Sequence, residues 1–166
     1  LRGTRGYLAP EWLTNYAISE KSDVYSYGML LLEIIGGRKN YDPSFISEKS
    51  HFPSYAFKMM EEGNVRELLD SKLELQEDDE SVLNAVKVAL WCIQEDTNLR
   101  PSMGRVVKML EGICPVPHPP TSSPLGTRIF STFSKSISSL GTSSGPSGSE
   151  INSDAYLSAV RLSGPR

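Results

Sequence analysis

The sequence predicts a mainly α-helical domain in residues 1–114, followed by a disordered tail in residues 115–166. Three observations point to this class. Apolar residues are concentrated before residue 115, they recur there at helical spacing, and no segment shows the alternation of a convincing strand. In the tail, 30 of 52 residues are Ser, Thr, Gly or Pro. The apolar residues that remain are too few for their burial to offset the entropy of ordering the segment.

The N-terminal segment is predicted to be a loop that leads into a long buried helix. Residues 1–9 are rich in glycine, and Pro10 stands where a short helical turn tolerates proline. A helix is then expected from about Lys21 to Ile35, with Ser19 as its N-cap and Gly36-Gly37 as its stop. Its apolar residues cover nearly every face, which is typical of a buried helix.

A polar excursion over residues 40–51 is expected to separate this helix from a second one. The second helix is predicted from Pro53 to Glu62, where Gly63 ends it, and a shorter one is predicted at residues 65–70.

Two more helices are predicted towards the end of the domain. Acidic residues 77–80 precede a one-sided apolar pattern over residues 82–93, and acidic side chains favour a helix N-terminus. The last helix is expected to begin near Pro101-Ser102 and to end at Gly112.

Charge and cysteine usage exclude several classes of function. The net charge is −3, of which the tail contributes +2 and residues 1–114 contribute −5, so nothing suggests a nucleic-acid-binding face. Cys92 and Cys114 lack metal-site spacing and are expected to be reduced, partly buried thiols. The longest apolar stretch, Val24 to Ile35, is shorter than the ~20 residues that span a membrane.

Three spaced signatures carry the functional prediction. They are Gly3-Thr4-x-Gly6-Tyr7-x-Ala9-Pro10-Glu11, then Ser22-Asp23-Val24-Tyr25-Ser26-Tyr27-Gly28, then Arg100-Pro101. Ala-Pro-Glu alone is a weak signal, but the three in this order on these predicted elements are specific to protein kinases.

Residues 1–114 resemble the C-terminal lobe of plant receptor-like serine/threonine kinases, above all the G-type lectin S-receptor-like subgroup. The resemblance is strongest over residues 3–42, 89–95 and 100–103, and it extends to residues 156–166. It implies the C-terminal-lobe part of the protein-kinase α+β fold.

The resemblance assigns the first residues to a floor on which a substrate backbone lies. The implied substrate-binding residues are Gly3, Thr4, Gly6, Tyr7 and Ala9. In the family, the threonine that matches Thr4 hydrogen-bonds the catalytic Asp and its neighbouring Lys, and Tyr7 stands where tyrosine kinases have Trp. Both features imply Ser/Thr specificity, although Thr4 as an ordinary loop hydroxyl stays an alternative.

The resemblance also implies a structural set. Its members are Pro10, Glu11, Asp23, Gly28, Leu30, Ile34 and Arg100. Glu11 would pair with Arg100, and Asp23 would hold the catalytic-loop backbone. Leu30 and Ile34 would anchor the hydrophobic spines of the lobe, with plain core packing as the alternative.

The sequence contains no Gly-rich phosphate loop, Val-Ala-Ile-Lys strand, His-Arg-Asp loop or Asp-Phe-Gly motif. We therefore expect no catalytic residue and no ATP or Mg²⁺ ligand in this chain, which should be inactive alone. The expected parent is a single-pass kinase on the cytoplasmic side of the plasma membrane, and membrane contact would come only through its transmembrane segment. The expected partners are protein substrates and the upstream half of the kinase domain. A non-catalytic interaction fragment or a pseudokinase remnant stays open as the alternative.

Overall fold

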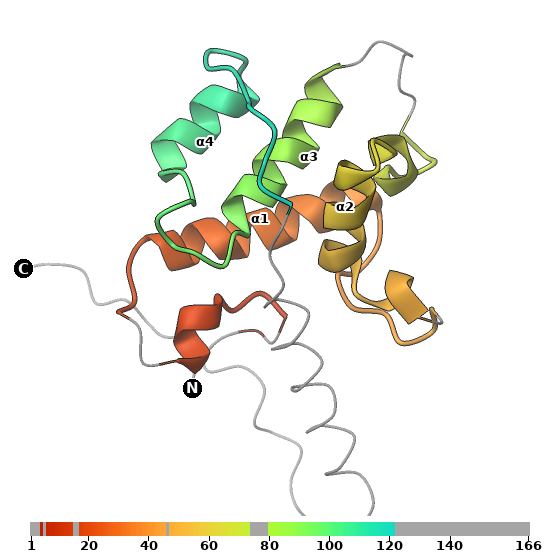
Figure 1. Cartoon of the computed structure of the whole chain (residues 1–166), viewed down its shortest axis with the longest axis horizontal. Coiled ribbons are helices and arrows are strands. Elements are labelled where there is room, and N and C mark those ends of the chain that lie inside the picture. Colours follow the sequence, from red (N-terminus) through yellow and green to blue (C-terminus); the bar gives the residue numbers. More distant parts are fainter. Residues whose placement is uncertain (1–3, 5, 15–16, 46, 74–79, 122–166) are drawn as a thin grey trace, which may run out of the picture. The chain divides into compact units, whose positions relative to one another are not determined.

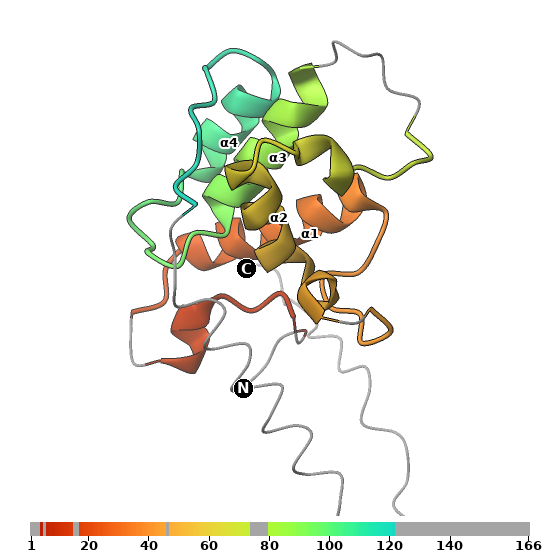
Figure 2. The same cartoon turned by 45° about the vertical axis from the view of Figure 1, so that its right-hand side comes forward.

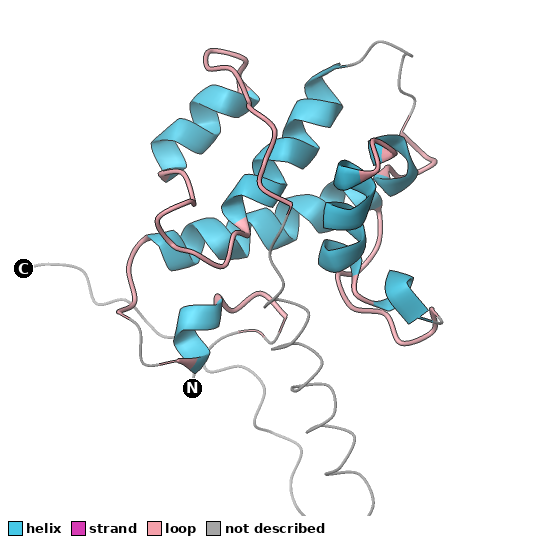
Figure 3. Cartoon of the chain, viewed as in Figure 1, coloured by secondary structure: helices cyan, strands magenta, loops and turns pink. Residues whose placement is uncertain are grey.

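The computed structural model describes residues 4, 6–14, 17–45, 47–73 and 80–121, and these are mainly helical, as predicted. Four α-helices are present in them: α1 (Lys21–Gly36), α2 (Phe52–Glu61), α3 (Glu80–Cys92) and α4 (Met103–Leu110). Three 3₁₀ turns are also described: η1 (Pro10–Leu13) precedes α1, η2 (Ser47–Ser50) lies between α1 and α2, and η3 (Val65–Leu68) lies between α2 and α3. Figure 3 shows helices and loops and no strand in the described part, where Tyr41 and His51 form an isolated β-bridge.

Helix α3 crosses α1 and also contacts α2 and α4 (Figures 1 and 2). One buried cluster joins α1, α2, η3 and α3 and includes Met29, Phe52 and Leu90. A second joins α1, α3 and α4 through Val24, Val88 and Val106. None of the described helices is long and apolar enough to cross a membrane.

The crossing of α1 and α3 depends on Gly28. A Cβ atom at this position would lie 2.5 Å from the Cβ of Cys92 and 3.0 Å from the carbonyl oxygen of Ala89. Both contacts involve α3 atoms close to its backbone, which cannot move away as the end of a flexible side chain can. Glycine at this position therefore allows the two helices to approach closely.

Gly28→Ala is expected to lower the free energy of unfolding by about 1–3 kcal/mol, because the added methyl group overpacks this crossing. Gly104→Ala is the matched control, since a Cβ on this α4 glycine meets nothing within 4 Å. Alanine there should stabilise the chain by about 0.5–1 kcal/mol. Urea denaturation measures both variants, and two changes of the same sign would contradict the crossing geometry.

The ends of α1 differ slightly from the prediction. Gly37 has a φ of 60° and closes the helix in the left-handed conformation, so the predicted stop is confirmed. The expected N-cap at Ser19 is wrong, because Glu20 already has helical dihedrals and occupies the cap position without a side-chain bond. Ser19 still contributes, as its Oγ accepts from the amide of Lys21 at 3.3 Å.

The all-round burial expected for α1 is only partly correct. Val24, Met29 and Leu32 are buried, but Leu30 is 47% and Ile34 is 66% exposed. Asp23, which is also exposed, Leu30 and Ile34 recur at i, i+7 and i+11 and so lie on one face of the helix. The described elements cover the rest of α1 and leave this face uncovered, so we call these three residues the α1 stripe.

Helix α4 has a similar uncovered face. Ser102 caps the helix by accepting the amide of Arg105 at 3.3 Å, and Val106 and Met109 are buried against the second cluster. Met103, Val107 and Leu110 are exposed on the other side, and we call them the α4 stripe.

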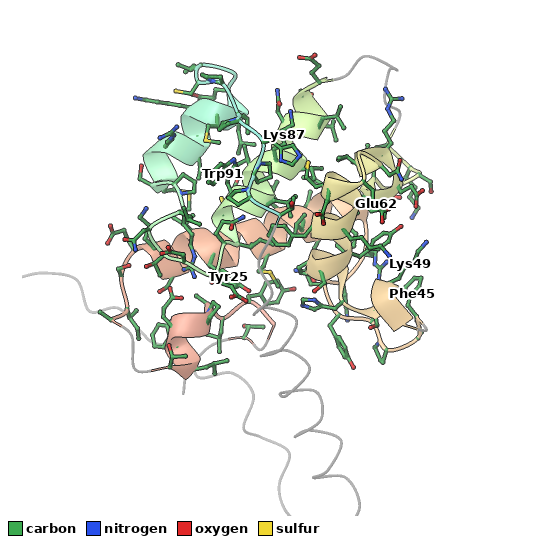
Figure 4. The ribbon with its side chains drawn as sticks, viewed as in Figure 1. Tyr25, Phe45, Lys49, Glu62, Lys87 and Trp91 are labelled. Carbon is green, nitrogen blue, oxygen red and sulfur yellow. The ribbon has the colours of Figure 1, made fainter. Side chains whose placement is uncertain are left out.

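Residues 115–121, assigned to the tail from composition, pack against α3, and we call them the proline strap. Pro119 is fully buried, and Val116 lies against the second cluster. The indole Nε1 of Trp91, labelled in Figure 4, donates to the carbonyl of Pro117 at 3.0 Å, and Gln94 Nε2 donates to the carbonyl of Pro120 at 3.1 Å. The folded part therefore extends past Cys114, because prolines bury apolar rings without needing a helix. Residues 122–166, where the tail was expected to be disordered, lie outside the described residues.

A chain that ends at residue 114 is expected to be less stable than one that ends at residue 121 by about 2 kcal/mol, since it lacks two hydrogen bonds and the buried proline. Trp91→Phe tests this contact, because it removes the indole N–H and keeps an aromatic ring. The substitution should cost about 1 kcal/mol in the longer chain and less in the shorter one. Equal costs in urea denaturation would mean that the strap does not bind Trp91.

Candidate substrate-binding segment and its brace

The expected pair between Glu11 and Arg100 is present and buried. Arg100 Nη1 lies 2.7 Å from Glu11 Oε1 and Nη2 lies 3.0 Å from Oε2, which is a bidentate arrangement. The Arg100 side chain is 0% exposed and the Glu11 side chain is 2% exposed. The pair joins η1, just after the N-terminal segment, to the loop between α3 and α4.

The remaining donors of Arg100 bind backbone carbonyls. Nε donates to Gln94 at 2.6 Å, Nη1 to Lys21 at 3.0 Å and Nη2 to Glu95 at 3.2 Å. Together with the two bonds to Glu11, these use all five guanidinium N–H groups. One buried side chain thus holds η1, the start of α1 and the end of α3 together.

Hydrogen bonds keep the Glu11 carboxylate charged despite its burial. Burial alone would raise the pKa of Glu11, but the hydrogen bonds from Arg100 and from Ser22 outweigh it and hold the pKa below its usual value. The Ser22 hydroxyl donates to Glu11 Oε1 at 2.7 Å. The carboxylate therefore stays ionised and paired at neutral pH.

The aromatic ring of Tyr25 completes this environment. The guanidinium carbon of Arg100 lies 4.9 Å from the ring centroid, and Figure 4 shows Tyr25 on α1 beside the loop that follows α3. Burial raises the pKa of Tyr25 to about 12, although the charge of Arg100 acts in the opposite direction. Tyr25 therefore stays neutral, and its ring packs against the Arg100 guanidinium.

The segment before η1 is held on α1 mainly through Tyr7. Its hydroxyl donates to Glu33 Oε2 at 2.6 Å, and its carbonyl accepts from Ser26 Oγ at 2.8 Å. Gly6 has a φ of 95°, a conformation that favours glycine, and the amide of Tyr7 closes a turn on the carbonyl of Thr4 at 3.2 Å.

The other residues predicted for this segment are distributed as follows. Thr4 and Gly6 are exposed, Ala9 is fully buried, and Pro10 begins η1. Gly3 lies outside the described residues. The structure therefore fixes the backbone around Tyr7 and leaves Thr4 exposed.

The structural set divides into a connected part and an uncovered part. Glu11, Arg100 and Gly28 lie in buried contacts, whereas the α1 stripe of Asp23, Leu30 and Ile34 is exposed. Sequence reasoning missed Ser22, Ser26 and Glu33 as anchors. Glu33 had a signal, since its carboxylate interrupts the apolar run from Met29 to Ile35.

The two cysteines are free thiols. Cys92 is buried and Cys114 is partly buried, as expected. Burial raises the pKa of Cys92 to about 12, so this thiol stays protonated and inert at neutral pH.

Comparison with known families identifies the class of protein to which these features belong. Residues 1–110 match the family model described as Protein kinase domain. The chain therefore belongs to the protein kinase family.

Three relatives from Arabidopsis thaliana are named as receptor-like kinases. The chain is 66% identical over its whole length to the G-type lectin S-receptor-like serine/threonine-protein kinase SD2-5, of which it covers 20%. It is 54% identical over 68% of its length to the G-type lectin S-receptor-like serine/threonine-protein kinase At5g24080, and 50% identical over 74% to a probable receptor-like protein kinase, At5g20050. It covers 13% and 28% of those two relatives. The predicted resemblance to the G-type lectin subgroup is confirmed.

Proposed function

We propose that this chain is the substrate-docking and scaffold part of a receptor-like protein kinase that transfers the γ-phosphoryl group of ATP to Ser or Thr of proteins. The observation that carries this proposal is the buried bidentate pair of Glu11 and Arg100. It fixes the end of the N-terminal segment to the helical core, so that the segment can present a defined surface to a substrate.

The chemistry makes such positioning valuable. Phosphoryl transfer depends on alignment and electrostatics more than on covalent catalysis by the protein, and a misplacement of about 1 Å can cost about 100-fold in rate. In this proposal Gly3, Thr4, Gly6, Tyr7 and Ala9 form the floor under the substrate backbone. The hydrogen bonds of Tyr7 to α1 support that role because they tie the middle of the floor to a core helix.

Protein kinases use ATP and Mg²⁺. In the described part of the chain, no group of three or more His, Cys, Asp or Glu could hold a metal ion. In this proposal, residues outside the chain bind ATP and Mg²⁺.

The upstream half of the kinase domain is the proposed partner of the uncovered helix faces. Leu30 and Ile34 of the α1 stripe and the three residues of the α4 stripe expose apolar side chains on two helices whose opposite faces are core. Contiguous exposed apolar surface marks an interaction site or an aggregation liability. The isolated chain should accordingly be poorly soluble.

The relatives' names support a place on the cytoplasmic side of the plasma membrane for the proposed parent. In this proposal the membrane is reached only through a transmembrane segment of the parent. Protein substrates are the other expected partners, and no feature of the described surface argues for nucleic acid.

The deciding assay compares phosphate transfer by a longer protein that contains this chain with transfer by the purified chain alone. Labelled ATP and a generic Ser/Thr protein substrate are used in both. The longer protein should be active and the chain alone inactive. Activity of the purified chain would contradict the proposal. Lack of phosphate transfer by a longer protein with intact upstream motifs would support the non-catalytic alternative.

Thr4 is the residue whose replacement tests the floor directly. Thr4→Val should lower kcat by roughly 10- to 100-fold through misplacement of the substrate hydroxyl, and Thr4→Ser should restore most of it. Thr14→Val is the matched control, because Thr14 is an exposed threonine that follows η1. Equal effects of Thr4→Val and Thr4→Ser would show that the hydroxyl has no part in the reaction.

A further inference from the structure

Gln94 connects two features that the proposed function leaves separate, the proline strap and the Glu11–Arg100 pair. It lies two residues after the end of α3 and is 3% exposed. Its side-chain Nε2 donates to the carbonyl of Leu90 at 3.0 Å and to the carbonyl of Pro120 at 3.1 Å. Its own carbonyl accepts Arg100 Nε at 2.6 Å. One buried residue therefore contacts the strap through its side chain and the ion pair through its backbone.

The proline strap is held at the end of α3 in one register. The two donors, Trp91 Nε1 and Gln94 Nε2, lie three positions apart, and so do their acceptors, the carbonyls of Pro117 and Pro120. An extended proline-rich segment repeats every three residues, so carbonyls three positions apart point to the same side. Pro119 lies between the two acceptors and is fully buried. A shift of the strap by one residue would therefore break both hydrogen bonds and displace this ring.

The amide group of Gln94 depends on the strap for one of its acceptors. The nitrogen of a glutamine amide carries two N–H groups, and the carbonyls of Leu90 and Pro120 accept one each. Without the strap, the second N–H would need water or another acceptor, because an unmade hydrogen bond in a buried site is unfavourable. The strap therefore helps to hold Gln94 in its present position.

A change in the position of Gln94 acts directly on Arg100. The bond from Arg100 Nε to the Gln94 carbonyl is the shortest of the five that the guanidinium donates. The guanidinium is planar and rigid, so a shift at Nε also displaces Nη1 and Nη2, which hold the Glu11 carboxylate at 2.7 and 3.0 Å. Glu11 follows Ala9, the last residue of the proposed floor, by two positions. The strap is thereby linked to the floor through Gln94, Arg100 and Glu11, all of which are buried.

We propose that Gln94 is a positioning residue through which the docked proline strap holds the Glu11–Arg100 pair, and with it the substrate floor, in the arrangement that binds the protein substrate. The proposal rests on the proposed function of the floor. It makes residues 115–121 part of the substrate-binding apparatus, although they follow α4 and do not contact the substrate. Release of the strap from α3 would weaken substrate binding and leave every residue of the floor in place in the sequence.

Steady-state kinetics of the longer protein test the effect on substrate. Ending the chain after residue 114, which removes the strap, should raise KM for the protein substrate about fivefold or more, with KM for ATP unchanged. Ending the chain after residue 121 is the matched control and should change neither constant. A general loss of folded protein would lower the apparent kcat and leave KM as it is. An unchanged KM for the protein substrate in the shorter chain would therefore overturn the proposal.

Gln94→Met tests the route from the strap to Arg100. Methionine keeps the length of the side chain and the backbone carbonyl, but it cannot donate to Pro120. The variant should raise KM for the protein substrate about as much as removal of the strap does, and the combination should add little. Asn98→Met is the matched control and should change neither constant, because the Asn98 amide donates at 3.0 Å to Asp96 within the same loop. Independent, multiplicative effects of Gln94→Met and strap removal would overturn the proposed route through Gln94.

Unfolding of the longer protein in urea separates this proposal from the proposed function. Ser22→Ala removes the hydrogen bond that the Ser22 hydroxyl donates to Glu11 Oε1 at 2.7 Å. Ser22→Ala and removal of the strap should be non-additive in the unfolding equilibrium constant by severalfold when Gln94 is present, and additive in the Gln94→Met background. This result requires no phosphate transfer, so it stands if only the proposed function fails. Additivity in both backgrounds would overturn the proposal whatever the kinetics show.

Discussion

In the longer protein that contains this chain, replacing Arg100 with alanine is expected to lower the free energy of unfolding by about 3–5 kcal/mol, because it leaves a buried carboxylate without its partner. Glu11 would keep the hydroxyl of Ser22 and lose both guanidinium bonds. Three backbone carbonyls, those of Lys21, Gln94 and Glu95, would lose a donor at the same time. Urea or guanidinium denaturation, monitored by circular dichroism, measures the difference.

Arg105→Ala is the matched control for Arg100→Ala. Arg105 is an exposed arginine on α4, and surface substitutions of this kind usually change stability by less than about 0.5 kcal/mol. A loss below about 1 kcal/mol for Arg100→Ala would mean that the pair behaves as an exposed salt bridge and does not brace the segment.

The chain is expected to lose about 2–3 kcal/mol of stability through His51 alone as the pH falls from about 6.5 to about 4. Burial lowers the pKa of His51 from 6.5 to about 4. The unfolded chain therefore takes up a proton near pH 6.5, whereas the folded chain takes it up only near pH 4. Stability from this residue is complete above pH 6.5 and declines as the unfolded state gains its proton.

His51 lies at the start of α2, where it is the N-cap residue and its Nδ1 lies 2.6 Å from Ser54 Oγ. His51→Gln removes the titrating group, so the difference in stability between wild type and variant should shrink or reverse between pH 6.5 and 4. His118→Gln is the control, since His118 is exposed in the proline strap. The same pH slope in wild type and His51→Gln would refute the role of His51.

Local sequence signals placed the helices well. The helices end within a residue or two of the predicted glycine stops. At the end of α1, for example, Gly37 adopts the left-handed conformation that few other residues tolerate. The partners Glu11 and Arg100 were also foreseeable, because each stands in a recognisable motif. Their bidentate geometry and the use of all five donors of Arg100 were not, since motif spacing carries no information on the distance between side chains.

Composition was less informative where packing decides. The proline strap has the composition of a tail, yet Pro119 is fully buried and Trp91 of α3 donates to the carbonyl of Pro117, because contacts with distant segments matter more here than the segment's own residue types. In the opposite direction, the apolar residues Leu30 and Ile34 are exposed, because the described elements cover only part of α1.

By itself, the sequence determined the helical class, the positions of the helices and the kinase family to which the chain belongs, because these depend on periodicity, helix-ending residues and short motifs. Only the tertiary structure decided which helix faces are covered and that Gln94 joins the proline strap to Arg100. Burial and hydrogen bonding depend on which segments from distant positions in the chain come into contact. They therefore cannot be inferred from local sequence patterns and are seen only once the helices are packed.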